Sequence, residues 1–259
     1  AVLVGLTGIN LTPANAVLSG TVTKGVLTIA TDNPAYAPWF DSNKPSNGKG
    51  FESAVAYAVA KQLGYSPSQV KWVTATFDSV IQPGKKNFDF DINQVSITEE
   101  RKKAVDFSSG YYNVAQAVVA LKDSKIAGAK SLSDLTSAKL GAATGTTSLT
   151  AITSTIKTKT QPSVYNTNDL AVAALSAKQT DGIVVDLPTA FYNSAVTDGA
   201  VLVGQLPASG KQEQFGLVLN KGSKLTTSVT KAVNALRKAG TLKALADKWL
   251  ANAGAPVLK

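Results

Sequence analysis

The first third of the chain alternates between the apolar spacing of strands and that of a helix. Its predicted elements are strands at 26–31, 72–77 and 88–98 and a helix at 51–63. The first strand ends at Asp32 and Pro34, which indicate a loop, and Gly64 follows the helix as a C-cap. Strands that alternate with helices predict a parallel sheet with crossover connections.

The same alternation returns in the middle of the chain. The predicted elements there are strands at 139–144, 163–166 and 182–188, a helix through Ala151, Ile152 and Ile156, and a helix at 170–178. The last third adds a strand at 215–220 and helices at 225–236 and 242–249. An extended apolar run at 115–122 separates the two α/β units. Two units joined by extended crossings predict two lobes that move about a hinge.

Three residue types with distinctive chemistry are missing, because the 259-residue chain contains no Cys, no Met and no His. Their absence excludes cysteine nucleophiles, histidine general bases, and zinc or haem sites built on these side chains. We therefore expect neither a cofactor nor a bound metal. No apolar stretch is long enough to span a membrane.

The net charge of +9 raises the question of a nucleic-acid partner. The basic residues are scattered lysines, and the two arginines, Arg101 and Arg237, lie far apart in the sequence. A scattered lysine surface is typical of a solvated face rather than of a phosphate-binding one. We therefore expect no nucleic-acid partner.

Polar segments follow four of the predicted strands, at the sheet edge where open α/β folds bind ligands. The first contains Asp32 and then aromatic residues held between prolines; it suits a ligand, and it equally suits an ordinary loop with core aromatics. The second supplies the hydroxyls of Ser96 and Thr98 and the guanidinium of Arg101, whose planar fork fits a carboxylate. The alternative, a capping box at the helix start, would need a different residue from Arg101 three positions after Thr98, so the ligand-binding interpretation is favoured.

The third segment, residues 144–148, is a glycine-containing turn before a helix. Backbone N–H groups at such a turn bind an anion, although an ordinary helix N-cap explains it equally well. The fourth ends at Asp186, a carboxylate at the end of a buried strand that needs a cation, either a ligand ammonium or a nearby lysine. A carboxylate site and an ammonium site on different lobes together predict an α-amino acid as the ligand.

At these segments the chain resembles the polar amino-acid family of solute-binding proteins (family 3) that serve ABC importers. The motifs that carry the resemblance are GFE (50–52), SITEERKKAVDFSSGYY (96–112), GTTS (145–148), GIVVD (182–186) and FGL (215–217). The similarity runs from about Val26 to Trp249, and the 96–112 stretch is its most specific part.

The resemblance implies an α/β fold with two lobes, the type II periplasmic-binding-protein fold, in which each lobe is a mostly parallel sheet flanked by helices and two segments form the hinge. Lobe 1 would comprise 26–115 and 212–259, lobe 2 would comprise 116–211, and 1–25 would be an N-terminal extension or tether. A monomer that works outside the cytoplasm is also implied, with an ABC permease as its membrane partner. Whether the full-length precursor carries a lipid anchor stays open.

The resemblance also assigns roles within the site. The predicted ligand-binding residues are Asp32, Tyr36, Glu52, Phe77, Gln94, Val95, Ser96, Arg101, Thr144, Thr147 and Asp186. By resemblance, Arg101 binds the ligand carboxylate with the help of Ser96 and Thr147. Asp186 binds the α-ammonium, and Gln94 lies nearby.

The ligand side chain is placed by the same resemblance between Tyr36 and Phe77, with Asp32 and Glu52 at its far end. Two acids favour a basic side chain, such as that of arginine, lysine or ornithine, but glutamine-binding relatives also carry acids here. We therefore expect a polar L-amino acid, with a small preference for a basic one.

Two other functions stay open at this point. An enzyme on the same fold, such as a dehydratase that acts on an amino-acid precursor, would need an acid near the leaving group, for which Glu52 or Glu100 is a candidate. A ligand-sensing module would use the same site with a different partner surface.

Overall fold

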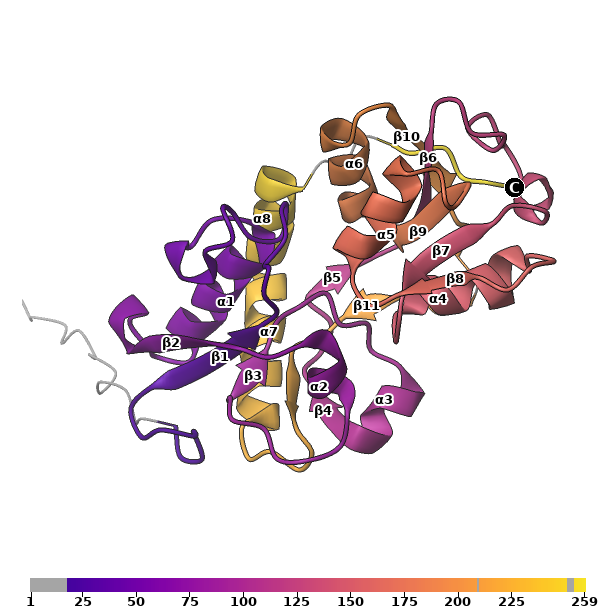
Figure 1. Cartoon of the computed structure of the whole chain (residues 1–259). Helices are drawn as coiled ribbons and strands as arrows, with labels where there is room; N and C mark the ends of the chain where they lie inside the picture. Colours follow the sequence, from indigo (N-terminus) through magenta and orange to yellow (C-terminus); the bar gives the residue numbers. More distant parts are fainter. Residues whose placement is uncertain (1–17, 209, 251–253) are drawn as a thin grey trace, which may run out of the picture.

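The computed structural model describes residues 18–208, 210–250 and 254–259, which form two lobes side by side (Figure 1). Each lobe is built on a five-stranded sheet. Residues 1–17 of the predicted N-terminal extension lie outside the described residues. Among the helices of the described part, none is long and apolar enough to cross a membrane.

Lobe 1 has the strand order β2-β1-β3-β12-β4. Its strands are β1 (Leu27–Thr31), β2 (Val70–Thr74), β3 (Phe90–Asp91), β4 (Val105–Phe107) and β12 (Val218–Asn220). Its helices are α1 (Phe51–Gln62), α2 (Phe77–Ile81), α3 (Glu99–Ala104), α7 (Thr226–Lys238) and α8 (Thr241–Trp249). Strand β1 is parallel to β2 and β3, whereas β12 is antiparallel to β3 and β4.

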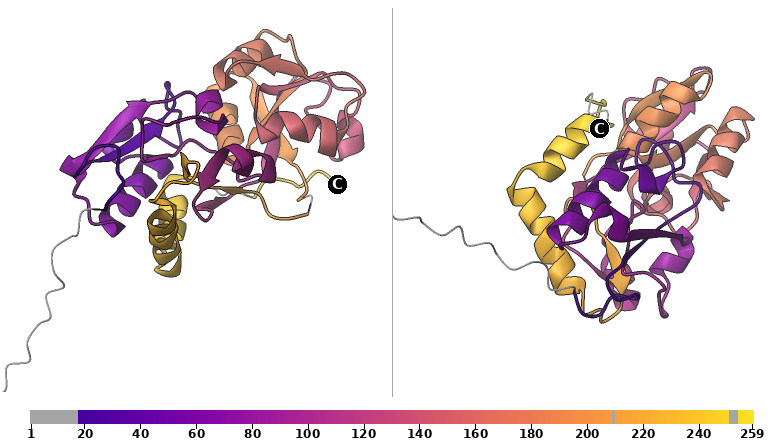
Figure 2. Two further views of the ribbon diagram at one scale, coloured as in Figure 1. Left: turned by 90° about the horizontal axis from the view of Figure 1, so that it is seen from below. Right: turned by 90° about the vertical axis from the view of Figure 1, so that its left-hand side faces the viewer.

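The larger core of lobe 1 lies under α1, α7 and α8, where Val55, Val229 and Leu242 pack against Ile29 and Phe90 of the sheet. Helices α7 and α8 follow one another along this side of the lobe (Figure 2). Their apolar side chains recur at helical spacing, so burial of one face of each helix stabilises the lobe.

Lobe 2 has the strand order β10-β6-β9-β7-β8. Its strands are β6 (Gln116–Leu121), β7 (Leu140–Ala143), β8 (Ser163–Tyr165), β9 (Gly182–Asp186) and β10 (Ala200–Gln205). Its helices are α4 (Thr147–Ala151) with the π-helical turn η4 (Ile152–Ile156), α5 (Asn168–Ser176) and α6 (Leu187–Val196). Helix α4 and η4 pack on one face of the sheet, and α5 and α6 on the other.

Of the chain segments that join the lobes, two pair with each other as a small antiparallel sheet of β5 (Tyr112–Asn113) and β11 (Gln214–Phe215). Strand β5 leads into β6 of lobe 2, and β11 leads back into β12 of lobe 1. The described part of the chain also contains three short 3-10 helices: η1 (Pro45–Asn47), η2 (Pro67–Gln69) and η3 (Leu132–Leu135).

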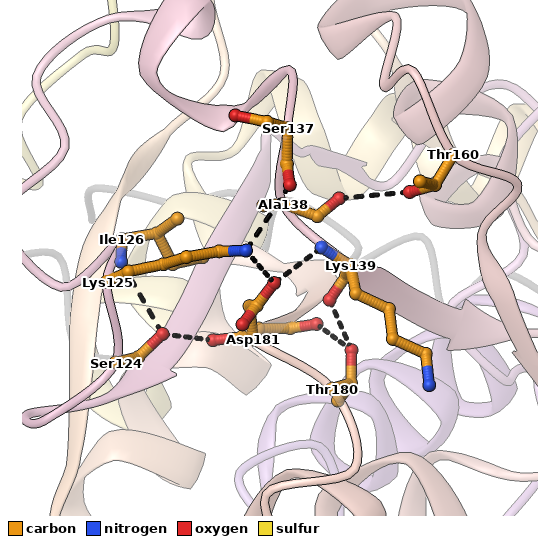
Figure 3. A network of polar contacts seen from close by, with 10 residues as sticks. Ser124, Lys125, Ile126, Ser137, Ala138, Lys139, Thr160, Thr180 and Asp181 are labelled. Atoms are coloured by element: carbon orange, nitrogen blue, oxygen red, sulfur yellow. Dashed lines mark hydrogen bonds and ion pairs between the residues drawn. The ribbon is translucent and has the colours of Figure 1, made fainter.

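A network of polar contacts lies at the amino ends of β7 and β9 in lobe 2, which are the ends away from Asp186 (Figure 3). Asp181 accepts the backbone N–H of Lys139 at 2.6 Å and pairs with Lys125 at 3.0 Å. The Thr180 hydroxyl donates to the Lys139 carbonyl. These bonds fix the strand ends by satisfying backbone groups that the sheet leaves unpaired.

Most predicted elements are confirmed, but both sheets are mixed rather than mostly parallel, because two of the four strand pairings in each are antiparallel. The local differences have physical causes. Strand β3 is shorter than predicted because Gln94 adopts a left-handed backbone conformation, with φ of 48°, and the chain leaves the sheet. Phe77 begins a helix rather than ending a strand, since the Thr76 side chain accepts the Ser79 N–H as an N-cap. Strand β9 ends at Asp186 rather than at residue 188, because Leu187 and Pro188 form the first turn of the unpredicted helix α6, where proline is tolerated.

The predicted lobe boundaries need two corrections. Val257 pairs with Gln205 of β10, so residues 254–259 belong to lobe 2 rather than to lobe 1. The end of the chain accordingly lies beside lobe 2 in both figures. At the other end, the Val22 N–H donates to Asp89 Oδ1 at 2.7 Å, so the last residues of the predicted tether are part of lobe 1.

Candidate ligand-binding site

A cavity of about 360 Å³ lies between the lobes, beyond the carboxyl ends of β1, β7 and β9. Nine of the eleven predicted residues line it, and they are Asp32, Tyr36, Phe77, Gln94, Ser96, Arg101, Thr144, Thr147 and Asp186. Residues that the sequence did not single out also line it, among them Asp78 and Asn93. The sheet edges therefore bring together side chains from both lobes, as the topology requires.

Arg101 lies near the start of α3, where Thr98 acts as the N-cap and accepts the Arg101 backbone N–H at 3.1 Å. Its guanidinium donates to the Ser96 carbonyl at 2.7 Å and, across the cleft, to the Gly145 carbonyl at 2.8 Å. The guanidinium carbon also lies 5.3 Å from the centre of the Phe77 ring. Burial lowers the pKa of Arg101 from its usual value, but an arginine stays charged at any physiological pH. Its remaining N–H groups are available to an anion.

Asp186 ends β9 and lies opposite Gln116, whose side-chain amide donates to it at 2.9 Å. Burial, and then the nearby carboxylate of Glu213, raise the pKa of Asp186 to about 8. No ion pair among the described residues involves Asp186, which disfavours the alternative of a structural salt bridge to lysine. A carboxylate in this position is stabilised by an incoming cation.

Glu213, which the sequence did not single out, connects the two lobes. It lies on the hinge just before β11, and it accepts hydrogen bonds from the Ser96 hydroxyl and, at 2.7 Å, from the Thr147 hydroxyl. The Gln116 amide donates to both of its oxygens, at 3.2 and 3.3 Å. Its only sequence signal is its place two residues before the FGL motif.

The aromatic residues Tyr36 and Phe77 both line the cavity. Asp32 fixes the start of α2, because its Oδ2 accepts the Phe77 N–H at 3.2 Å. Tyr36 reaches lobe 2, where its hydroxyl bonds to Asp169; burial and this carboxylate raise the pKa of Tyr36 well above its usual value. Asp32, Tyr36 and Phe77 therefore line the same cavity, and the predicted placement of a ligand side chain between the two rings stays a prediction.

Two lining residues add polar groups that were not predicted. A Cβ on Gly145 would lie 3.0 Å from Asp78 Oδ1, and Gly145 has φ of 70°, so this close approach across the cleft requires glycine. The Asn93 side-chain nitrogen is buried without a hydrogen-bond partner among the described residues. An unpaired donor at a cavity wall is costly unless a ligand or water meets it.

The prediction that Glu52 and Val95 line the cavity is wrong, because both residues are buried in lobe 1. Glu52 is fully buried in lobe 1, where it accepts the Gln94 N–H at 2.8 Å and bonds to the Gln94 side chain and the Tyr111 hydroxyl. Burial raises the pKa of Glu52 to about 7. Glu52 thus holds Gln94 from behind the cavity wall, and Val95 packs with Val80 in the core under β3.

The lobes touch across the cleft at several points besides Arg101 and Glu213. The Trp39 indole N–H of lobe 1 donates to the Thr189 hydroxyl of lobe 2 at 2.9 Å. The hydroxyl oxygens of Ser96 and Thr147 are 3.4 Å apart. The two lobes therefore contact each other directly in this structure. Within the described residues, no group of three or more acidic side chains is placed to hold a metal ion.

Comparison with known proteins places this chain among bacterial binding proteins. The family model of bacterial extracellular solute-binding proteins, family 3, matches residues 27–252. The L-arginine-binding protein of Pseudomonas aeruginosa is 28% identical over 237 residues, which are 86% of this chain and 90% of that protein. The L-cystine-binding protein TcyJ of Escherichia coli is 30% identical over 242 residues, which are 91% of this chain and 85% of that protein.

Solved structures give the same result for the fold. An ancestral arginine-binding protein bound to arginine superposes with a TM-score of 0.70 at 29% identity, over 88% of this chain and 99% of that one. The ancestral amino acid-binding protein AncCDT-1, a precursor of cyclohexadienyl dehydratase, also has a TM-score of 0.70, at 30% identity over 88% of this chain and 96% of that one. The chain therefore belongs to the family 3 bacterial extracellular solute-binding proteins and has the two-lobed type II periplasmic-binding-protein fold that its motifs predict.

Proposed function

We propose that this protein captures a free L-amino acid in the interlobe cavity outside the cytoplasm and delivers it unchanged to an ABC permease. The observation that carries the proposal is that Arg101 and Asp186, one from each lobe, line the same cavity. Their opposite charges match the two charged groups of an amino acid, so the ligand would join the lobes. The names of the relatives, which bind arginine and cystine, support the same ligand class.

An enzyme on this fold is less well supported, because neither acid named for it lines the cavity. Glu52 is fully buried behind the wall. The Glu100 side chain is 81% exposed and pairs with Lys103 on α3. The monomeric state and the permease stay predictions of the family resemblance, and a lipid anchor stays an open question.

We propose further that the ligand has a basic side chain. Among the described residues that line the cavity, three are acids, Asp32, Asp78 and Asp186, and one is a cation, Arg101. An amino acid's own carboxylate and ammonium would pair with Arg101 and Asp186. Asp32 and Asp78 would then face the rest of the ligand without a cation, which a guanidinium or ammonium side chain would supply.

Calorimetry of the ligand-free protein against single L-amino acids tests the function. Arginine, lysine and ornithine are expected to bind more tightly than glutamine, histidine or cystine, and aspartate is expected not to bind. Saturable binding of aspartate without binding of arginine or glutamine would contradict the proposed ligand class. No binding of any amino acid would remove the proposed function itself.

The double variant D32N/D78N is expected to weaken L-arginine binding by about tenfold or more, because at least one charge-assisted hydrogen bond to the ligand side chain, which contributes about 1.5–3 kcal/mol, is lost. L-Glutamine, which has no side-chain charge, should change by less than about threefold. D247N is the matched control, since Asp247 is an exposed acid of lobe 1 that pairs with Lys243 outside the cavity. An equal loss for both amino acids would show that the two acids only maintain the fold.

Amino-acid affinity is expected to fall as the pH falls from about 8 to about 6. Burial and the carboxylates of Glu213 and Glu52 raise the pKa of Asp186 to about 8, against the opposite effect of Arg101, so Asp186 is largely protonated below about pH 8. The ligand ammonium favours the ionised form, so binding must release that proton, and Kd rises by up to about tenfold per pH unit. Calorimetry in buffers of different ionisation heat counts the released protons. A Kd that is constant over this range would show that Asp186 does not meet the ammonium.

A further inference from the structure

Glu213 is the one hinge carboxylate that bonds to both lobes within the part of the chain that the structure describes. Its Oε1 accepts the Ser96 hydroxyl of lobe 1 and the Thr147 hydroxyl of lobe 2 at the same time. Both bonds can exist together only while the lobes are closed. The contacts therefore join recognition residues of the two lobes at the hinge.

Each of these hydroxyls has a single hydrogen and two lone pairs. Because Ser96 and Thr147 each give that hydrogen to Glu213, neither hydroxyl has one left for the cavity. Their oxygen atoms, which are 3.4 Å apart, therefore face a ligand only as acceptors. An acceptor binds an ammonium group and repels a carboxylate.

Glu213 approaches these hydroxyls from behind. It lines a second cavity of about 410 Å³ at the hinge, which shares Thr147 with the ligand cavity, and it is absent from the lining of the ligand cavity. Glu213 thus acts on a ligand only through the residues it holds. It supports residues that line the ligand cavity and does not itself contact the ligand.

The acceptor oxygens belong to one cluster with Asp186. The Gln116 side-chain nitrogen lies 2.9 Å from Asp186 Oδ1 and 3.4 Å from Thr147 Oγ1, and it also contacts Glu213. The Gln116 side-chain oxygen is fixed in turn by the Ser148 hydroxyl at 2.6 Å. These bonds determine the orientation of the Gln116 side-chain amide, so that its nitrogen points toward the oxygens of Asp186, Thr147 and Glu213.

We propose that Glu213 is a positioning residue that takes the hydroxyl hydrogens of Ser96 and Thr147 and so makes both oxygens acceptors for the ligand's α-ammonium, beside Asp186. This rests on the proposed function, since it requires an amino-acid ligand. It moves both hydroxyls from the carboxylate, where the family resemblance placed them, to the ammonium. Three acceptor groups then match the three N–H donors of the ammonium.

The test compares L-arginine with 5-guanidinopentanoate, which is arginine without its α-amino group. In E213L, which removes the acceptor at similar size, Kd for L-arginine is expected to rise by about tenfold or more, and Kd for 5-guanidinopentanoate by less than about threefold. E213Q keeps an acceptor oxygen without the charge, and it should stay within about threefold of the wild type for both ligands. Each Kd is measured by calorimetry on protein whose circular dichroism matches the wild type.

Q212L is the matched control, because Gln212 is the neighbouring hinge residue and bonds to the Val114 carbonyl at 2.8 Å rather than to a hydroxyl. It should leave the ratio of the two Kd values unchanged. If E213L weakened both ligands equally, Glu213 would only support the hinge, and the positioning role would be excluded. Tighter binding in E213L would show instead that Glu213 competes with the ligand. A loss of affinity in E213Q as large as in E213L would show that the charge of Glu213 matters rather than its acceptor oxygen. Either result overturns the proposal.

If E213L does not fold, E213A provides the same comparison with a smaller truncation. The failure of this inference differs from the failure of the proposed function. A wild type that binds L-arginine, with an unchanged Kd ratio in E213L or E213A, overturns only the role of Glu213. A wild type that binds no amino acid overturns both.

Discussion

Replacing Arg101 by alanine is expected to weaken amino-acid binding by about a hundredfold or more, because removing one partner of a buried charge pair costs about 3 kcal/mol or more. The ligand carboxylate would be left in the cavity without a cation, since Arg101 is the single basic residue among the described residues that line it. The variant also loses the contact to the Gly145 carbonyl that joins the lobes. Calorimetry with L-arginine and the other amino acids measures the loss.

R237A is the natural control for this experiment. Arg237 is the other arginine of the chain, and it also donates to a backbone carbonyl, that of Gly110, outside the cavity. It should bind amino acids as the wild type does. R101K separates charge from geometry, because lysine keeps the charge without the planar fork and should recover only part of the affinity. Near-wild-type affinity in R101A would refute the carboxylate role.

Replacing Asp186 by asparagine is expected to weaken L-arginine binding by about thirtyfold, because the hydrogen bond to a charged group that is lost contributes about 2 kcal/mol. Affinity for 5-guanidinopentanoate should change little, since this ligand has no α-ammonium. The pH dependence between about pH 6 and 8 should also disappear with the titrating carboxyl group. Calorimetry with both ligands at two pH values measures all three effects.

D198N is the matched control, because Asp198 is an exposed acid on the same lobe. It should leave both affinities and their pH dependence unchanged. An equal loss of both ligands in D186N would mean that Asp186 maintains the cleft through Gln116 rather than binding the ammonium.

The sequence predicted the site wherever a polar residue follows directly on an apolar strand. Asp32 after β1 and Asp186 at the end of β9 are examples, because the end of a strand fixes the position of the next side chain at the sheet edge. The α/β architecture of each lobe was predicted from the spacing of apolar residues, which differs between strands and helices. Arg101 was found through its motif, and its helix start places it at the cavity.

The errors concern side chains whose direction depends on tertiary contacts. Glu52 begins a helix, and a first-turn glutamate faces solvent or interior according to what packs beside it; here Gln94 and Tyr111 draw it inward. Glu213 lies on a short hinge segment without periodicity, so no pattern could indicate that it meets Ser96. Asp78 was missed because its helix, α2, has only five residues and gives almost no helical signal.

Because the C-terminal residues lie on lobe 2, the two ends of the described chain are attached to different lobes. Lys24 belongs to lobe 1 and Lys259 to lobe 2, and both are exposed. The chain contains no cysteine, so cysteines introduced at these two positions would be the only thiols available for labelling. A donor and an acceptor fluorophore placed there would lie on different lobes, so the efficiency of energy transfer between them would report any change in the distance between the lobes.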